Sequence, residues 1–255
     1  MPDPTDPILL LHGQPGNARD WAAVREAIGT RAVTIAFDRP GWDGRSAPTD
    51  LAGNAQAALA VLDAWGAARA TVVGHSLGGA IAAWMAAEHP DRVRSLVLAA
   101  PSANAASLNR VDRLLARPVV GPALGATVLA GLGLALAAPV LRERIGAGLG
   151  LGGPYLKVSG HALIDPRAWH AFAVEQRALI DELPSLEQRV QRISAPTTIV
   201  VGTADRIVPP VSALLLAARI TGAEVVEIEG ASHLLPQQHA ERLAAIVVEA
   251  ARTLD

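Results

Sequence analysis

The chain has 255 residues, of which 51% are hydrophobic and 18% are charged, so it is long enough for a full core and too apolar to be disordered. The formal net charge is −2, with no dense run of Lys or Arg, which argues against nucleic acid as a partner. There is no cysteine, which excludes a thiol nucleophile and a cysteine-ligated zinc site.

The N-terminus, Met1-Pro2-Asp3-Pro4, has neither a basic start nor an apolar signal core, so we expect a cytoplasmic protein. Residues 118–141 carry no charge and are numerous enough to span a bilayer. However, Pro122 and Pro139 interrupt this stretch, which lies between segments typical of one soluble domain. We therefore expect a buried or substrate-facing helical segment and no stable membrane span.

The first hundred residues alternate between short apolar runs and segments with helical spacing. The expected strands are 8–11, 32–37, 71–74 and 93–98, and the expected helices are 17–28, 51–65 and 77–88. Alternation with short connections predicts parallel strands with helices on both faces of the sheet. The continuously apolar strands support this prediction, because a sheet covered by helices on both faces has no solvent-exposed face.

From residue 101 to residue 192 the alternation stops, and the segment is helix-like and rich in Ala, Leu and Gly. The alternation then resumes, with expected strands 197–201 and 224–228 and expected helices 210–220 and 237–253. The chain is therefore predicted to be an α/β protein with a mostly parallel, doubly wound sheet. Its core comprises residues 1–100 and 193–255, and residues 101–192 form an inserted helical lid.

Gly74-His75-Ser76-Leu77-Gly78 matches G-x-S-x-G between an expected strand and an expected helix. A serine at such a turn has a strained backbone and an exposed hydroxyl, and the glycines allow close backbone approach. The alternative is a glycine-rich turn that binds phosphate. Because this turn has neither the G-x-G-x-x-G order nor the P-loop lysine, Ser76 is the predicted nucleophile.

A serine nucleophile needs a base, and the base needs a carboxylate that orients it. His233 lies on the short loop after the last expected strand, and Asp205 follows the strand before it. The alternatives are a surface histidine beside the last helix and an aspartate in an ordinary turn. The order Ser76, Asp205, His233 is the one that accompanies G-x-S-x-G, so this triad is predicted.

The oxyanion formed in acyl chemistry needs backbone N–H donors. One predicted donor is Leu77, directly after the nucleophile. The other belongs to the loop His12-Gly13-Gln14-Pro15-Gly16 and is expected to be Gln14, since Pro15 has no N–H. This chemistry requires no metal and no organic cofactor.

These motifs resemble those of the α/β-hydrolase superfamily, in its lid-bearing serine hydrolase branch of esterases, carbon–carbon bond hydrolases and cofactor-free haloperoxidases. Further matching segments are Asp38-Arg39-Pro40-Gly41, His89-Pro90-Asp91-Arg92-Val93, Gly202-Thr203-Ala204-Asp205 and Gly230-Ala231-Ser232-His233. The resemblance covers almost the whole core and implies acyl chemistry. Epoxide hydrolases and haloalkane dehalogenases have aspartate at the elbow, and epoxide hydrolases usually have two lid tyrosines. Ser76 and the single lid tyrosine, Tyr155, argue against both activities.

The chain departs from that family in two places. The loop over residues 38–46 is one residue longer than usual. Only seven residues precede the first expected strand, where relatives usually carry an antiparallel hairpin. We therefore predict about six strands, all parallel, with an altered free edge that favours self-association as a homodimer.

The expected activity is cleavage of a carboxylic ester or related acyl bond in a small hydrophobic substrate. Trp42, His75 and Trp169 are expected to contact that substrate. The apolar lid either covers the sheet or lines an acyl pocket. Two alternatives stay open: a small-molecule receptor or signalling protein with slow turnover, and a perhydrolase or acyltransferase.

Overall fold

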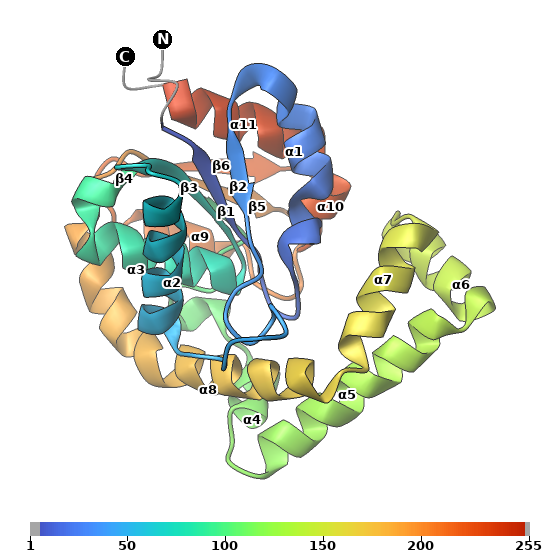
Figure 1. Ribbon diagram of the computed structural model, residues 1–255. Helices are drawn as coiled ribbons and strands as arrows, with labels where there is room; N and C mark the ends of the chain where they lie inside the picture. Colours follow the sequence, from blue (N-terminus) through green and yellow to red (C-terminus); the bar gives the residue numbers. More distant parts are fainter. Residues whose placement is uncertain (1–5, 253–255) are drawn as a thin grey trace.

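The computed structural model describes residues 6–252, and six strands in this range form one parallel sheet (Figure 1). The strand order is β2-β1-β3-β4-β5-β6, and every pairing is parallel. The strands are β1 Ile8–Leu11, β2 Thr34–Ala36, β3 Ala70–His75, β4 Val93–Ala99, β5 Thr197–Gly202 and β6 Glu224–Ile228. This confirms the prediction of a six-stranded parallel sheet of the α/β-hydrolase type.

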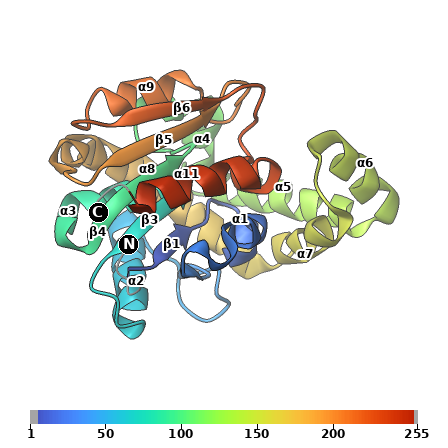
Figure 2. The same ribbon diagram turned by 90° about the horizontal axis from the view of Figure 1, so that it is seen from above.

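The strands are apolar on both sides because helices cover both faces of the sheet (Figures 1 and 2). One face packs against α1 Ala22–Ile28 and α11 Ala240–Arg252. The other packs against α2 Leu51–Ala64, α3 Leu77–Glu88, α8 Pro166–Arg189 and α9 Val211–Ala217.

The register of the sheet brings the predicted site loops together at one edge. Leu11 pairs with Gly74, so the loop after β1 lies beside the turn after β3. Gly202 pairs with Ile228, which places the loops carrying Asp205 and His233 side by side. Since the carboxyl ends of parallel strands share one edge, these loops converge where such sheets bind ligands.

Several elements differ from the predicted ranges: α9 ends at Ala217, and a 3-10 turn, Ala18–Trp21, precedes α1. β2 is only three residues long, whereas six were expected. The single helix expected over residues 237–253 is divided into α10 Leu235–Gln238 and α11, because His239 leaves the helical region with φ −127° and ψ 38°. The short α10 therefore continues the loop that carries His233.

Five helices lie between β4 and β5, in the range expected for the lid: α4 Arg110–Leu115, α5 Val120–Ala137, α6 Pro139–Leu149, α7 Gly153–Leu163 and α8. Helix α8 lies along the core, whereas α5, α6 and α7 project away from it (Figures 1 and 2). We call α5–α7, residues 120–163, the lid arm.

Helix α5 is long and apolar enough to cross a membrane by length and composition alone. Its buried positions form one stripe: Gly121, Gly125, Leu129, Gly133 and Leu136. A Cβ at Gly133 would lie 2.9 Å from the carbonyl oxygen of Gly160, and one at Gly160 would lie 2.7 Å from Leu136 Cβ. Glycine therefore lets α5 and α7 pack backbone against backbone.

This packing predicts opposite effects for two glycines of the same helix. Gly133→Ala is expected to lower the free energy of unfolding by about 1–3 kcal/mol, because its methyl group must push α7 away. Gly131 has nothing within 4 Å of the corresponding position, so Gly131→Ala is expected to raise it by about 0.5–1 kcal/mol through better helix propensity. Urea unfolding of both variants measures the two effects, and equal shifts would contradict the close packing.

Candidate active site

Ser76 occupies a strained turn between β3 and α3. Its backbone has φ 53° and ψ −119°, a combination that non-glycine residues rarely adopt. A Cβ at Gly78 would collide with the carbonyl oxygens of Leu11 and His12, and one at Gly74 would collide with Gly78 itself. The glycines therefore permit the sharp turn, and α3 begins directly after it with its N-terminal N–H groups at the site.

Asp205 and His233 are brought together as the sequence predicts. His233 Nδ1 lies 2.8 Å from Asp205 Oδ2, and both residues are buried. Asp205 Oδ1 accepts the N–H groups of Ile207 and Val208 at 2.8 and 2.9 Å. Burial acts to raise the pKa of Asp205, but the hydrogen bond to His233 and the two backbone donors outweigh it and hold the pKa below its ordinary value.

Ser76 and His233 line one pocket of about 360 Å³, which we call the Ser76 pocket. Gln14, His75 and Leu77 line it as well. Because Nδ1 of His233 faces Asp205, its Nε2 remains for the serine hydroxyl. The described residues include no group of three His, Asp or Glu side chains that could hold a metal ion.

The peptide group between Gly13 and Gln14 has a fixed orientation. The Gly13 carbonyl accepts Arg39 Nη2 at 3.0 Å and His12 Nδ1 at 2.8 Å. His12 Nδ1 must carry the proton, because Nε2 accepts the Arg39 backbone N–H at 3.1 Å. In a trans peptide the C=O and the next N–H point in opposite directions, so the Gln14 N–H points away from Arg39. This is the N–H predicted as an oxyanion donor.

A buried ion pair between Arg39 and Glu175 links this region to the lid. Their side chains are 0% and 1% exposed, and Arg39 Nη1 bonds Glu175 Oε1, while Nη2 lies 3.2 Å from Oε2. Trp42 Nε1 donates to Glu175 Oε2 at 2.9 Å, and Asn54 Nδ2 lies 3.5 Å from Oε1. The sequence analysis missed this pair, because Glu175 has no motif and lies 136 residues from Arg39.

The three residues expected to contact substrate lie in different places. His75 lines the Ser76 pocket, but its Nε2 donates to the His233 carbonyl at 2.9 Å and so supports the loop of His233. Trp42 lines a second pocket, between the lid arm and the core. Trp169 lines neither pocket: it packs in the lid and donates to the Leu163 carbonyl at 2.7 Å. Contact between Trp169 and substrate stays a prediction.

Comparison with known proteins shows which family and fold the chain resembles. The family model described as the alpha/beta hydrolase family matches residues 8–246. A pimeloyl-[acyl-carrier protein] methyl ester esterase of Neisseria meningitidis serogroup B is 29% identical over 252 residues, covering 96% of this chain and 93% of that protein.

Two solved structures have similar folds. A hydrolase from Pseudomonas aeruginosa has a TM-score of 0.74 at 25% identity and covers 97% of this chain and 91% of its own. An esterase from Exiguobacterium antarcticum has a TM-score of 0.77 at 21% identity and covers 97% of this chain and 92% of its own.

The buried ion pair predicts a large loss of stability when one charge is removed. Glu175→Gln is expected to lower the free energy of unfolding by about 3–5 kcal/mol, because Arg39 stays buried without a counter-charge. Asp181→Asn is the matched control, since Asp181 lies on the same helix in an exposed pair with Arg177 at 3.5 Å. Asp181→Asn is expected to lower the free energy of unfolding by less than about 0.5 kcal/mol. Urea unfolding that gave equal costs would contradict a structural role for the buried pair.

The buried His75 predicts a pH-dependent stability. Burial, and then the nearby His233, lowers the pKa of His75 from 6.5 to about 3. Between these values the unfolded chain binds a proton here and the folded protein does not. This group therefore reduces the free energy of unfolding as pH falls below 6.5, by about 1.4 kcal/mol per pH unit.

The comparison of wild type with His75→Gln isolates this effect, because titrating groups common to both proteins cancel in the difference. Urea unfolding at pH 7, 6 and 5 is expected to give the variant the flatter pH profile. Parallel profiles would mean that His75 titrates normally in the folded protein.

Proposed function

Because the chain belongs to the alpha/beta hydrolase family, we propose that it is a serine esterase that cleaves a carboxylic ester, or a related acyl bond, of a small hydrophobic substrate. The observation that carries the proposal is the 2.8 Å contact between His233 Nδ1 and Asp205 Oδ2. His233 and Ser76 both line the Ser76 pocket. The Neisseria relative is named for cleavage of a methyl ester, which favours an ester as the substrate.

In the proposed first half-reaction, His233 Nε2 takes the proton of the Ser76 hydroxyl while Oγ bonds to the ester carbonyl carbon. The carbonyl oxygen becomes an oxyanion and accepts the Leu77 and Gln14 N–H groups. Asp205 stabilises the imidazolium that forms, and its lowered pKa keeps it ionised at neutral pH. The tetrahedral intermediate then expels the alcohol, which leaves with the proton from His233.

In the second half-reaction, His233 takes a proton from water as the water oxygen attacks the acyl carbonyl. The oxyanion uses the same two donors. When this intermediate collapses, the carboxylic acid leaves and Ser76 Oγ regains a proton from His233. One ester and one water thus give one acid and one alcohol, with no other reactant required.

The walls of the Ser76 pocket favour an apolar substrate. Leu108, Phe172, Leu179 and Val208 line it, and Leu132 from the lid arm closes one side. Ligand pockets of this kind bind mainly through apolar burial, with a few polar groups that orient the ligand. Here the orienting groups are the predicted oxyanion donors.

The triad predicts loss of ester hydrolysis in Ser76→Ala. The kcat for p-nitrophenyl acetate is expected to fall by about 10⁴-fold or more, since removal of a serine nucleophile typically costs about 10⁶-fold. Ser194→Ala, at an exposed serine outside the pocket, is the matched control and is expected to match wild type. If wild type were no faster than Ser76→Ala on this ester and on longer esters, the esterase proposal would fail.

A further inference from the structure

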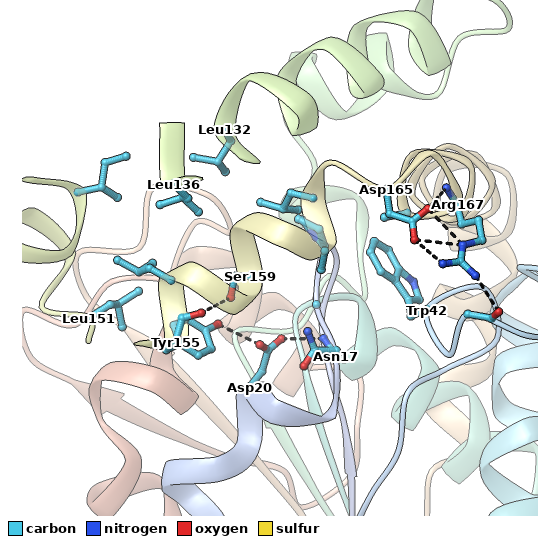
Figure 3. Close-up of a pocket in the computed structure, with 18 of the residues that line it drawn as sticks. Asn17, Asp20, Trp42, Leu132, Leu136, Leu151, Tyr155, Ser159, Asp165 and Arg167 are labelled. Atoms are coloured by element: carbon cyan, nitrogen blue, oxygen red, sulfur yellow. Dashed lines mark hydrogen bonds and ion pairs between the residues drawn. The ribbon is translucent and has the colours of Figure 1, made fainter. Parts of the chain in front are cut away.

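A second pocket lies between the lid arm and the core, and we call it the lid chamber. It has a volume of about 240 Å³ (Figure 3). The core supplies residues from the loops after β1 and β2, including Asp20 and Trp42. The lid arm supplies Leu132, Leu136 and Leu156 among others. The mechanism proposed above uses none of these residues.

The lid chamber has a mainly apolar lining, in which Asp20 is hydrogen-bonded by neutral groups and Asp165 is paired with Arg167. Figure 3 shows leucines gathered around Tyr155 and Ser159, with the pair Asp165–Arg167 at the far end beyond Trp42. Arg167 Nη2 lies 2.7 Å from Asp165 Oδ2, and Arg167 Nη1 donates to the Gly44 carbonyl at 3.0 Å. An anionic ligand would be buried here beside the Asp20 carboxylate and with the Arg167 guanidinium already paired, which is costly, whereas an alkyl chain loses no polar contact.

The lid chamber and the Ser76 pocket share part of their walls. Pro15, Asp20, Leu132 and Tyr155 line both. The Tyr155 hydroxyl donates to Asp20 Oδ1 at 2.9 Å, and Asp20 Oδ2 accepts the Asn17 N–H at 3.1 Å. The Tyr155 hydroxyl and the Asp20 carboxylate thus bond each other, while the other two shared residues, Pro15 and Leu132, are apolar.

We propose that the lid chamber binds the apolar chain of the ester, which extends from Ser76 past Pro15 and Leu132 into the lid arm. This inference rests on the proposed esterase function and adds a substrate class to it: esters with an unbranched alkyl chain too long for the Ser76 pocket alone. The chain belongs to the acyl part or to the alcohol part of the ester, and the experiment distinguishes the two.

The helices that enclose the lid chamber fix its shape. Leu136 lies against Gly160 where α5 and α7 meet, so it cannot move outward without separating the two helices. Leu136 is 3% exposed, whereas Leu134, two residues away on the same helix, is 64% exposed and lines neither pocket. A larger side chain at Leu136 therefore fills the chamber, and one at Leu134 extends into solvent.

The test compares Leu136→Trp with the control Leu134→Trp on two ester series at pH 8. This pH keeps Asp20 ionised, since burial raises its pKa to about 6. One series is p-nitrophenyl acetate to octanoate, and the other is ethyl to octyl acetate. The measured quantity is kcat/KM for the longest ester divided by kcat/KM for the shortest.

In Leu136→Trp this ratio is expected to fall about fourfold for each methylene excluded from the chamber. The fall is expected in one series only, which identifies the side of the ester that the chamber binds. Leu134→Trp is expected to keep the wild-type ratio. Wild-type ratios in both series for Leu136→Trp would overturn the proposal.

A second variant tests whether the effect of Leu136→Trp comes from filling the chamber or from disturbed packing of the buried site. Ala162 lines the lid chamber from an exposed position on α7, so Ala162→Phe narrows the chamber with little risk to the core. The same fall in the ratio is expected, with a thermal midpoint equal to that of wild type. If only Leu136→Trp changed the ratio, the effect would reflect disturbed packing, and the proposal would be wrong.

A binding measurement separates failure of this proposal from failure of the esterase function. Ser76→Ala is titrated calorimetrically with methyl octanoate and octyl acetate, with and without Leu136→Trp. Weaker binding of one ester in the double variant supports the chamber even where no hydrolysis is seen. Equal binding of both esters in the two proteins rejects the chamber even where Ser76 proves to be the nucleophile.

Discussion

The guanidinium of Arg39 and the carboxylate of Glu175 form a buried ion pair, and the arrangement of the site depends on it. Arg39 follows β2 in the core, and Glu175 lies on α8 of the lid, so the pair fixes α8 against the core. Arg39 also bonds the Gly13 carbonyl, which orients the Gln14 N–H. An apolar pair of similar volume is often as stable as a buried ion pair. Stability alone therefore does not explain why these two residues are charged. The explanation is that Arg39 binds both Glu175 of the lid and the Gly13 carbonyl.

The lid consists of two parts with different attachments. Helix α8 packs on α2 and α3 through buried leucines and belongs to the core energetically. Trp169 and Phe172 of α8 pack against the apolar cluster of the lid arm, Leu129, Leu136, Leu156 and Leu163. The arm also reaches the core through polar contacts, among them Tyr155 to Asp20 at 2.9 Å and Gln238 to the Leu149 carbonyl at 2.6 Å. The lid arm is therefore attached to α8 by apolar packing and to the rest of the core by a few polar contacts.

The core was predictable from the sequence because its signals are local. Apolar strands covered on both faces leave continuous runs such as Ile8–Leu11, and Gly74 and Gly78 mark the Ser76 turn within five residues. The partners Asp205 and His233 followed from strand order, because parallel strands share one carboxyl edge. The directions of Trp42 and Trp169 did not follow, since each indole binds an oxygen supplied by tertiary packing. The packing of the lid arm could not be predicted either. Helix α5 is apolar all round, so no periodicity in its sequence distinguishes the buried stripe from the exposed face.

The backbone of Ser76 carries a consequence for how such a chain evolves. A residue with a side chain at φ 53° and ψ −119° costs about 1–3 kcal/mol relative to a relaxed conformation, and glycine would remove most of that cost. Selection for stability alone would therefore replace Ser76 with glycine. Serine at this turn is therefore a cost in stability, and the proposed role of its hydroxyl as the nucleophile accounts for that cost.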